Sequence, residues 1–188
     1  MGTISLCVIA RDEEDMLPGL LDSVRGIVDE VILVDTGSQD ATVALAEASG
    51  ARVIHHPWQD DFSDARNVAA DAASGVYVLV LDADERLSKK SLKVIRHAVE
   101  HASGYCGLIR LLNASRMDAT LDEVLDGTAV LQEPVWLARL FRNAPDLRWH
   151  GRVHEHVNSQ KSSVSICVDE IHNSYFLPVI TLQAHVIS

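Results

Sequence analysis

The apolar residues of this chain fall into short runs that are separated by amphipathic stretches. The clearest run is Val76 to Leu81, which has six apolar residues and no polar alternation. A run of this length is too short for a free-standing helix and is typical of a strand covered on both faces of a parallel sheet. Similar runs at Ile4 to Ile9, Glu30 to Asp35 and Ala51 to His55 predict three more strands.

The stretches between these runs have the spacing of helices. Apolar residues recur at positions 17, 20, 21 and 24, which predicts a helix that ends near Gly26. An alanine-rich helix is expected from about Thr42 to Ser49. A third helix is expected to be capped by Ser63 and to end at Gly75. A fourth follows Ser88 and has apolar residues on one face, at positions 92, 95 and 99.

The alternation of strand and helix predicts an α/β fold, with a mostly parallel, doubly wound central sheet and helices on both faces. A chain of 188 residues can bury one large core, so we expect a single domain over residues 1–188. Tyr105 to Asn113 and Val135 to Phe141 continue the strand pattern. The interval Ala114 to Glu133 has no clear periodicity, and its length makes it a candidate lid or substrate loop.

The charge balance disfavours one class of partner. The chain has 16 basic and 27 acidic residues, a net charge of -11, which opposes binding to the phosphate backbone of a nucleic acid. Its three cysteines form no Cys-x-x-Cys pair and lie in apolar or strand-like runs, so we expect reduced thiols in the cytoplasm. The sequence has neither the pattern of a leader nor that of a transmembrane segment.

Acidic residues follow the central strand, at the edge where ligands bind in open α/β sheets. Asp82, Asp84 and Glu85 come directly after Leu81. If the chain stays extended through Ala83, Asp82 and Asp84 project to the same side, and their charges repel unless a cation or a proton relieves them. A hard divalent cation would satisfy this pair and keep sites open for a phosphate. A solvated acidic turn that caps the next helix is the alternative.

The sequence lacks the motifs of several other enzyme classes. The turn after the first strand is Ala10-Arg11-Asp12-Glu13, where a dinucleotide-binding fold would have a glycine-rich turn. The sequence contains no P-loop motif and no Gly-x-Ser-x-Gly nucleophile elbow. Without a glycine-rich or P-loop motif, backbone N–H groups alone would not bind a phosphate, which again favours a metal ion. Without a nucleophile elbow, acyl transfer is disfavoured.

Polar segments in a fixed order form the strongest pattern in the chain. They are Ala10-Arg11-Asp12-Glu13-Glu14, Asp35-Thr36-Gly37-Ser38-Gln39-Asp40-Ala41-Thr42, Asp61-Phe62-Ser63-Asp64-Ala65-Arg66-Asn67 and Asp82-Ala83-Asp84-Glu85. With these segments the sequence resembles the family 2 glycosyltransferases of the GT-A fold, in particular a bacterial branch that includes lipopolysaccharide-core glucosyltransferases and enzymes fused to tetratricopeptide repeats. The resemblance extends into the second half through Arg139-Leu140-Phe141-Arg142-Asn143 and Gly151-Arg152-Val153-His154-Glu155.

The resemblance implies a nucleotide-sugar site, with a UDP-linked sugar as the donor. Asp35 would accept hydrogen bonds from uracil or ribose, since an ionised carboxylate is only an acceptor. Arg66 and Asn67 would face the base or the diphosphate. Asp82 would contact the ribose and the metal shell, and Asp84 would bind Mn²⁺ or Mg²⁺. The nucleotide-binding residues implied in this way are Ala10, Arg11, Asp12, Asp35, Gly37, Ser38, Arg66, Asn67, Asp82 and Ala83.

The resemblance also implies a metal-dependent transfer with inversion. Glu155 would be the catalytic base that takes the proton of the acceptor, with Asp169 and Glu170 as rivals. His172 would be a further metal ligand, because Mn²⁺ accepts imidazole more readily than Mg²⁺ does. Residues 1–113 would form the nucleotide-sugar half, and residues 114–188 the acceptor and metal side. The expected acceptor is a glycan, a lipid-linked glycan or a protein, reached in the cytoplasm or peripherally at the inner face of the membrane.

Several alternatives stay open. Asp35 could be a helix cap, and Arg66 could pair with Asp64 or Asp61. A catalytically idle nucleotide-sugar-binding module of a larger protein would carry the same motifs. A phosphatase with Asp82 as its nucleophile is disfavoured, because in such enzymes the acidic pair follows the first strand and precedes threonine or valine.

The chain departs from the family pattern in two places. Asp12 stands where an asparagine is common, which could change a nucleotide contact. Asn173-Ser174-Tyr175 stands where a glycine often precedes the tyrosine, which loosens the assignment of His172.

Overall fold

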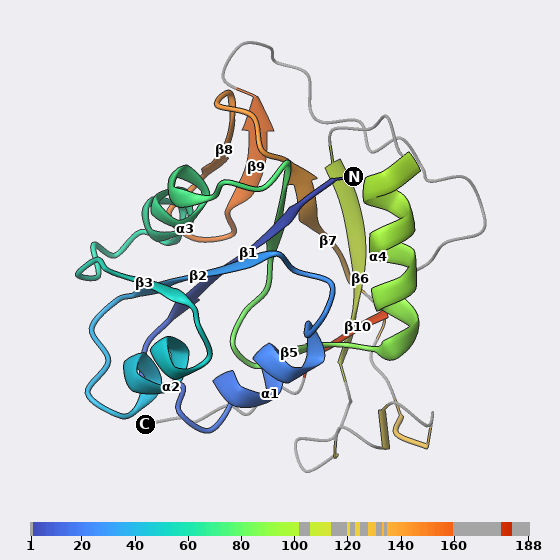
Figure 1. The fold of residues 1–188 in the computed structure, drawn as a ribbon, viewed down its shortest axis with the longest axis horizontal. Helices are drawn as coiled ribbons and strands as arrows, with labels where there is room; N and C mark the ends of the chain where they lie inside the picture. Colours follow the sequence, from blue (N-terminus) through green and yellow to red (C-terminus); the bar gives the residue numbers. More distant parts are fainter. Residues whose placement is uncertain are drawn as a thin grey trace.

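The computed structural model describes residues 2–101, 106–113, 120, 123–124, 128–130, 133, 135–159 and 178–181. Its centre is an eight-stranded sheet in the order β3-β2-β1-β4-β7-β6-β10-β5 (Figure 1). Strands β3, β2, β1 and β4 run parallel, β7 is antiparallel to β4 and β6, and β10 is parallel to β6 and antiparallel to β5. The strands of this sheet are β1 (Ile4–Ala10), β2 (Glu30–Asp35), β3 (Arg52–His55), β4 (Tyr77–Val80), β5 (Glu85–Leu87), β6 (Cys106–Asn113), β7 (Val135–Arg142) and β10 (Pro178–Thr181).

Helices alternate with the first strands, as the periodicity predicts. They are α1 (Leu17–Ser23), α2 (Thr42–Ala48), α3 (Phe62–Ala72) and α4 (Lys89–His101). A separate antiparallel pair consists of β8 (Leu147–His150) and β9 (His156–Ser159). The prediction of an α/β fold with a mostly parallel central sheet is confirmed. Within the described residues, none of the helices is both long and apolar enough to cross a membrane.

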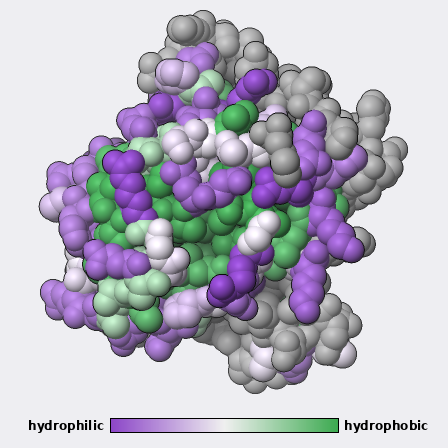
Figure 2. All heavy atoms as spheres, in the orientation of Figure 1, coloured by the Kyte–Doolittle hydropathy of each residue, from purple (hydrophilic) through white to green (hydrophobic). Residues whose placement is uncertain are grey.

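Each face of the sheet is covered by its own layer. On one face, strand residues such as Leu6 and Leu79 pack with Leu20 of α1, Ala46 of α2 and Ile95 of α4. Figure 2 shows apolar residues gathered across the middle of the molecule in this view, with hydrophilic residues around them. The other face packs against α3 and the β8–β9 pair, through residues that include Ala65, Ala69, Val80, Phe141 and Trp149. The strands with continuous apolar runs are thus covered on both sides.

Strand register brings the loops after β1, β2 and β4 to one edge of the sheet. Ala10, the last residue of β1, pairs with Asp35, the last residue of β2. On its other side β1 pairs with β4, where Cys7 lies opposite Val80. Because these strands are parallel, the segments that follow all three leave the sheet at its carboxyl edge. Burial raises the pKa of the Cys7 thiol to about 12, as expected for a reduced core cysteine.

The helix starts differ from the sequence prediction in one case. Asp61, rather than Ser63, is the N-cap of α3, and its side chain accepts a hydrogen bond from the Asp64 backbone N–H. Ser63 lies inside the first turn, where its hydroxyl donates to the Gly151 carbonyl at 2.5 Å. Ser63 therefore makes a tertiary hydrogen bond and does not cap the helix. Ser88 does cap α4, since its Oγ accepts from the Ser91 backbone N–H.

Candidate active site at the carboxyl edge of the sheet

The acidic segment after β4 forms a tight turn. The Glu85 backbone N–H donates to the Asp82 carbonyl at 2.9 Å, and β5 then begins at Glu85. The chain is therefore not extended through Ala83, so the condition under which strand alternation would place Asp82 and Asp84 on the same side is not met. Four residues joined by this hydrogen bond instead make a reverse turn. The two carboxylates still lie close enough for the charge of Asp82 to act on Asp84.

Asp82 is held between two buried arginines. Its Oδ1 accepts from Arg66 Nη2 of α3 at 2.9 Å, and its Oδ2 accepts from Arg139 Nη2 of β7 at 2.8 Å. Only 6% of the Arg66 side chain and 9% of the Arg139 side chain are exposed, against 35% for Asp82. Both guanidinium groups are thus fixed by the core, while the carboxylate between them keeps about a third of its side chain exposed.

The chain of opposite charges continues in both directions from Asp82. Arg139 Nη2 also donates to Glu85 Oε1 at 2.6 Å, and Glu85 is 2% exposed. Arg66 Nε donates to Glu155 Oε1 at 2.7 Å. The result is an unbroken series, Glu155 to Arg66 to Asp82 to Arg139 to Glu85, in which each arginine joins two carboxylates. We call these five residues the charge chain.

The protonation of the charge chain follows from burial and from its alternating signs. Burial raises the pKa of Asp82, but the charges of Arg66 and Arg139 outweigh this effect and hold that pKa well below its usual range. Burial also raises the pKa of Glu85, to about 7, with Arg139 acting against the rise and Asp82 adding to it. The pKa of Arg139 is raised, because Asp82 and Glu85 together outweigh its burial. Asp82 is therefore ionised in the folded protein.

Buried N–H groups remain available beside these ion pairs. In the part of the chain that the structure describes, the buried side-chain nitrogens without a hydrogen-bond partner are Arg66 Nη1, Arg139 Nε and Trp149 Nε1. The Arg66 guanidinium also lies over the Trp149 ring, 5.2 Å from its centroid. All three nitrogens are donors only. Buried donors without acceptors are costly, so their concentration at this edge suits an anionic or oxygen-rich ligand.

A second part of the site is formed by the loops after β1 and β2. Asp12 has a left-handed backbone with φ 55°, a conformation that aspartate and asparagine tolerate better than most residues. Its N–H donates to Ser38 Oγ at 3.0 Å, and its Oδ1 accepts from the Gln39 N–H at 2.6 Å. The substitution of aspartate for a common asparagine thus preserves this backbone conformation and an acceptor for the neighbouring loop. Gly37 has φ 120°, which a side chain would strain.

Asp35 is fixed at the end of β2 and caps no helix. Its Oδ1 accepts from the Ser38 N–H at 2.9 Å, and its Oδ2 is 3.1 Å from His55 Nδ1. Burial alone would raise the pKa of Asp35, but the hydrogen bonds from Ser38 and His55 lower it. The side chain is therefore an ionised acceptor in a fixed orientation, and the helix-cap alternative is wrong.

The two parts of the site meet at Glu13. Burial raises the pKa of Glu13, and the charges of Asp84, Asp40 and Asp82 raise it further. Asp84 has a similar environment, because burial and then the charge of Asp82 raise its pKa. Negative charge therefore accumulates between the loop after β1 and the acidic turn. Asp84 fits a divalent cation in this respect, since a partly buried carboxylate near other anions gains from a bound cation.

The structure tests other site predictions to different extents. Arg66 pairs with Asp82 and Glu155, so the suggested pairing with Asp64 or Asp61 is wrong. Asn67 connects α3 to β8, because its side chain donates to the Trp149 carbonyl and accepts from the Trp149 N–H. Arg11 is exposed and pairs loosely with its neighbour in the sequence.

The remaining predictions fall on other parts of the chain. Asp169, Glu170, His172 and most of the candidate lid lie outside the described residues. Among the residues that are described, no group of three histidine, cysteine or acidic side chains is arranged to hold a metal ion. A cation at Asp84 would therefore rely on few protein ligands and on substrate oxygens, as Mg²⁺ often does.

Sequence reasoning missed Glu85, Arg139 and Trp149 as site residues. In the sequence, Glu85 is one of several acids that follow the central strand, and Arg139 is one residue of a longer motif. The one signal in the sequence was a polar residue inside an apolar strand, Arg139 in Val-Trp-Leu-Ala-Arg-Leu-Phe. Such a residue needs a buried partner, but the sequence does not say which carboxylate supplies it.

Comparisons with known proteins show which family the sequence resembles. The sequence model described as Glycosyl transferase family 2 matches residues 5–153. TPR repeat-containing protein Synpcc7942_0270 of Synechococcus elongatus is 40% identical over 158 residues, which is 84% of this chain and 36% of that protein. An uncharacterized glycosyltransferase of Rickettsia felis is 41% identical over 90 residues, which is 48% of this chain and 31% of that protein. The chain thus spans about a third of the length of these relatives.

Among solved structures, residues 1–349 of TarS from S. aureus are similar, with a TM-score of 0.47 and 25% identity. The similarity covers 61% of this chain and 36% of that one.

Proposed function

Because this chain belongs to glycosyl transferase family 2, we propose that it transfers a sugar from a UDP-linked donor to an acceptor hydroxyl, with inversion. The observation that carries the proposal is the charge chain, which connects Asp82 at the carboxyl edge of the sheet with Glu155 through the single guanidinium of Arg66. Ligands of open α/β sheets bind at this edge. A donor site and a catalytic base would then share one fixed side chain.

The loops after β1 and β2 would hold the nucleoside. Uracil and ribose offer N–H and O–H donors, and Asp35 is an ionised acceptor held by Ser38 and His55. Ala10, Arg11 and Asp12 would border the same ligand from the first loop. Hydrogen bonds of this loop with Ser38 and Gln39 hold it in place, which supports a preformed binding loop.

The diphosphate would lie beside the two arginines of the charge chain and near Asp84 of the acidic turn. Arg66 Nη1 and Arg139 Nε are buried donors without a partner, and hydrogen bonds from a cation to a phosphate are among the strongest in proteins. We assign Asp84 as the main protein ligand of Mn²⁺ or Mg²⁺, with Asp82 near it and His172 as a further candidate. When bound, the cation would neutralise charge on the departing diphosphate.

Glu155 would act as the base. Its Oε1 is oriented by Arg66 Nε, and 15% of its side chain is exposed. As the acceptor oxygen bonds to the anomeric carbon of the sugar, Glu155 would take the hydroxyl proton, and the bond from that carbon to the UDP oxygen would break. Attack on the face opposite the leaving group inverts the configuration. A phosphatase with Asp82 as nucleophile is disfavoured, because both carboxylate oxygens of Asp82 already accept from arginine.

Calorimetric titration of UDP tests the donor site. We expect UDP to bind the wild-type chain more tightly with Mn²⁺ than with EDTA, and Asp84→Asn to abolish that difference. Asp22→Asn is the control, because Asp22 is an exposed carboxylate of α1 that is paired only with Arg25 in the described contacts. Metal-dependent binding that persists undiminished in Asp84→Asn would refute the role of Asp84.

A turnover assay tests the transfer itself. UDP release from UDP-glucose and UDP-N-acetylglucosamine would be followed with panels of glycan, lipid-linked glycan and peptide acceptors. Acceptor-dependent release supports a transferase. UDP binding without release for any donor and acceptor would instead support an idle nucleotide-sugar-binding module.

A further inference from the structure

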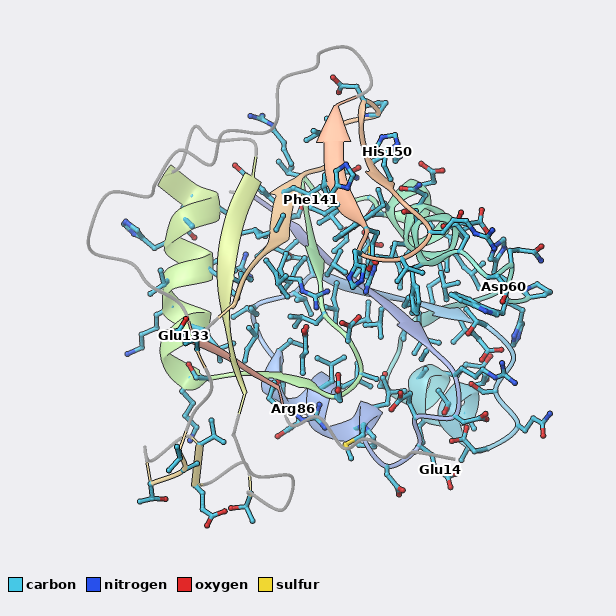
Figure 3. The ribbon with its side chains drawn as sticks, turned by 180° about the vertical axis from the view of Figure 1, so that it is seen from behind. Glu14, Asp60, Arg86, Glu133, Phe141 and His150 are labelled. Atoms are coloured by element: carbon cyan, nitrogen blue, oxygen red, sulfur yellow. The ribbon has the colours of Figure 1, made fainter. Side chains whose placement is uncertain are left out.

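Arg86, the residue after Glu85, ties the acidic turn to helix α1. Its Nη1 donates to the carbonyls of Ala83 and Glu85, at 2.7 Å and 2.8 Å. Its Nη2 donates to the carbonyl of Met16, directly before α1, at 2.5 Å. Figure 3 shows Arg86 at this junction, beside α1 and below the centre of the sheet. One guanidinium therefore fixes carbonyls on both sides of Asp84 and connects them to the segment that follows the loop after β1.

Gly19 makes room for this guanidinium. A Cβ added to Gly19 would lie 2.6 Å from Arg86 Nε, 2.6 Å from Nη2 and 2.9 Å from Cζ. Glycine inside a helix is less stable than alanine, so its presence in the short helix α1 calls for a packing reason. The close approach of Arg86 supplies that reason. The arginine and the glycine thus form one matched contact.

The charge of Arg86 faces the anions of the site. Burial lowers the pKa of Arg86, and the charges of Asp84 and Glu13 act in the opposite direction. Arg86 in turn moderates the raised pKa of both carboxyl groups. It is therefore placed to reduce repulsion between two acidic segments at short range.

We propose that Arg86 is a positioning residue that sets the place of Asp84 relative to the loop after β1, and so tunes the binding of the divalent cation and the diphosphate. This inference rests on the proposed donor site. The planar guanidinium reaches three carbonyls at once, which the ammonium of a lysine on a flexible stem cannot reproduce in the same geometry. Groups that orient a metal ligand in this way typically change metal affinity about 10- to 100-fold when they are altered.

Two variants perturb this contact by different routes. Arg86→Lys keeps the charge and loses the fork of donors, whereas Gly19→Ala keeps the arginine and displaces it. Arg25→Lys is the matched control, because Arg25 lies just beyond α1 and its side chain is 80% exposed. Each protein would be titrated with Mn²⁺ at a fixed UDP concentration, and UDP affinity would be measured separately in EDTA.

We expect both variants to raise the Mn²⁺ concentration at half-maximal UDP binding by about 10-fold or more, with UDP affinity in EDTA unchanged. Arg25→Lys should match wild type. Midpoints within twofold of wild type in both variants would overturn the inference. Loss of UDP affinity in EDTA to the same extent would also overturn it, because that result indicates general disruption of the fold.

Hydrogen exchange without ligand separates this inference from the proposed function. Amides of the peptide spanning residues 81–88 should exchange faster in Arg86→Lys and Gly19→Ala, and unchanged exchange would overturn the positioning of the turn. If UDP binding to the wild-type protein does not depend on Mn²⁺, the proposed metal-dependent donor site is refuted. The role of Arg86 toward the cation is then overturned with it, whatever the exchange result.

Discussion

Replacement of Arg139 by methionine would leave Glu85 buried without its cation. Glu85 is 2% exposed, and its Oε1 would lose the 2.6 Å hydrogen bond from Arg139 Nη2. Methionine fills much of the volume of the arginine stem, so the main change is electrostatic and the cavity is small. Asp82 would keep Arg66, and Glu85 Oε2 would keep the Asp82 backbone N–H as a donor.

The cost of this change follows from how much of the charge chain survives. Removal of one partner from a buried ion pair costs about 3–5 kcal/mol, because it leaves a buried charge uncompensated. Since each carboxylate keeps one other donor, we expect about 3 kcal/mol at pH 8. The exposed pair of Arg25 and Asp22 gives the reference, and Arg25→Met should cost less than about 1 kcal/mol.

The pH dependence has a definite sign. The pKa of Glu85 is raised to about 7 even with Arg139 present, and loss of that cation raises it further. A group with a raised pKa in the folded state favours folding below its unfolded pKa, and this contribution disappears as the pH rises through the folded value. The loss of stability in Arg139→Met should therefore be smaller at pH 5, where Glu85 becomes neutral, than at pH 8.

Urea denaturation at pH 5 and pH 8 measures these differences. The double variant Arg139→Met/Glu85→Gln should recover about 1 kcal/mol or more at pH 8, because it removes the stranded charge. A loss at pH 8 no greater than that of Arg25→Met would refute the reasoning. So would a loss that grows on acidification, since it would mean that Glu85 is not the group left unpaired.

Three further changes probe the base, the nucleoside loop and the core. Glu155→Gln should lower turnover by about 10²- to 10⁴-fold and leave UDP affinity unchanged in calorimetry; full activity would assign the base elsewhere. Asp35→Ala should weaken UDP binding with Mn²⁺ and with EDTA by a similar factor, unlike a change at Asp84, and a purely metal-linked loss would contradict its contact with the nucleoside. Gly75→Ala should lower Tm by about 2–12 °C, because the added Cβ would lie 2.6 Å from Ser5 Oγ and 2.8 Å from Ser5 N; an unchanged Tm in calorimetry would show that β1 moves aside freely.

Local patterns carried the prediction of the fold. The apolar run before Asp82 predicts a central strand because burial on both faces leaves no place for alternating polar residues. The period of α4 predicts its buried face because Ile95 and Val99 lie one turn apart. Local patterns do not predict the turn after β4, for a related reason. Alternation holds only while the chain is extended, and the sequence Asp-Ala-Asp-Glu does not show where extension ends.

The charge chain could not be predicted in the same way, because its contacts join residues far apart in the sequence. Arg66 meets Glu155 across 89 positions, and Arg139 meets Glu85 across 54. A single sequence indicates that a buried arginine needs an anion, but many carboxylates are available in a chain with 27 of them. Strand order determines which carboxylates Arg139 meets. Strand β7 lies directly beside β4 and brings Arg139 to the end of β4, where the acidic turn begins. The same topology explains why both carboxylate oxygens of Asp82 accept from arginine, whereas we propose that Asp84, two residues later, binds the cation.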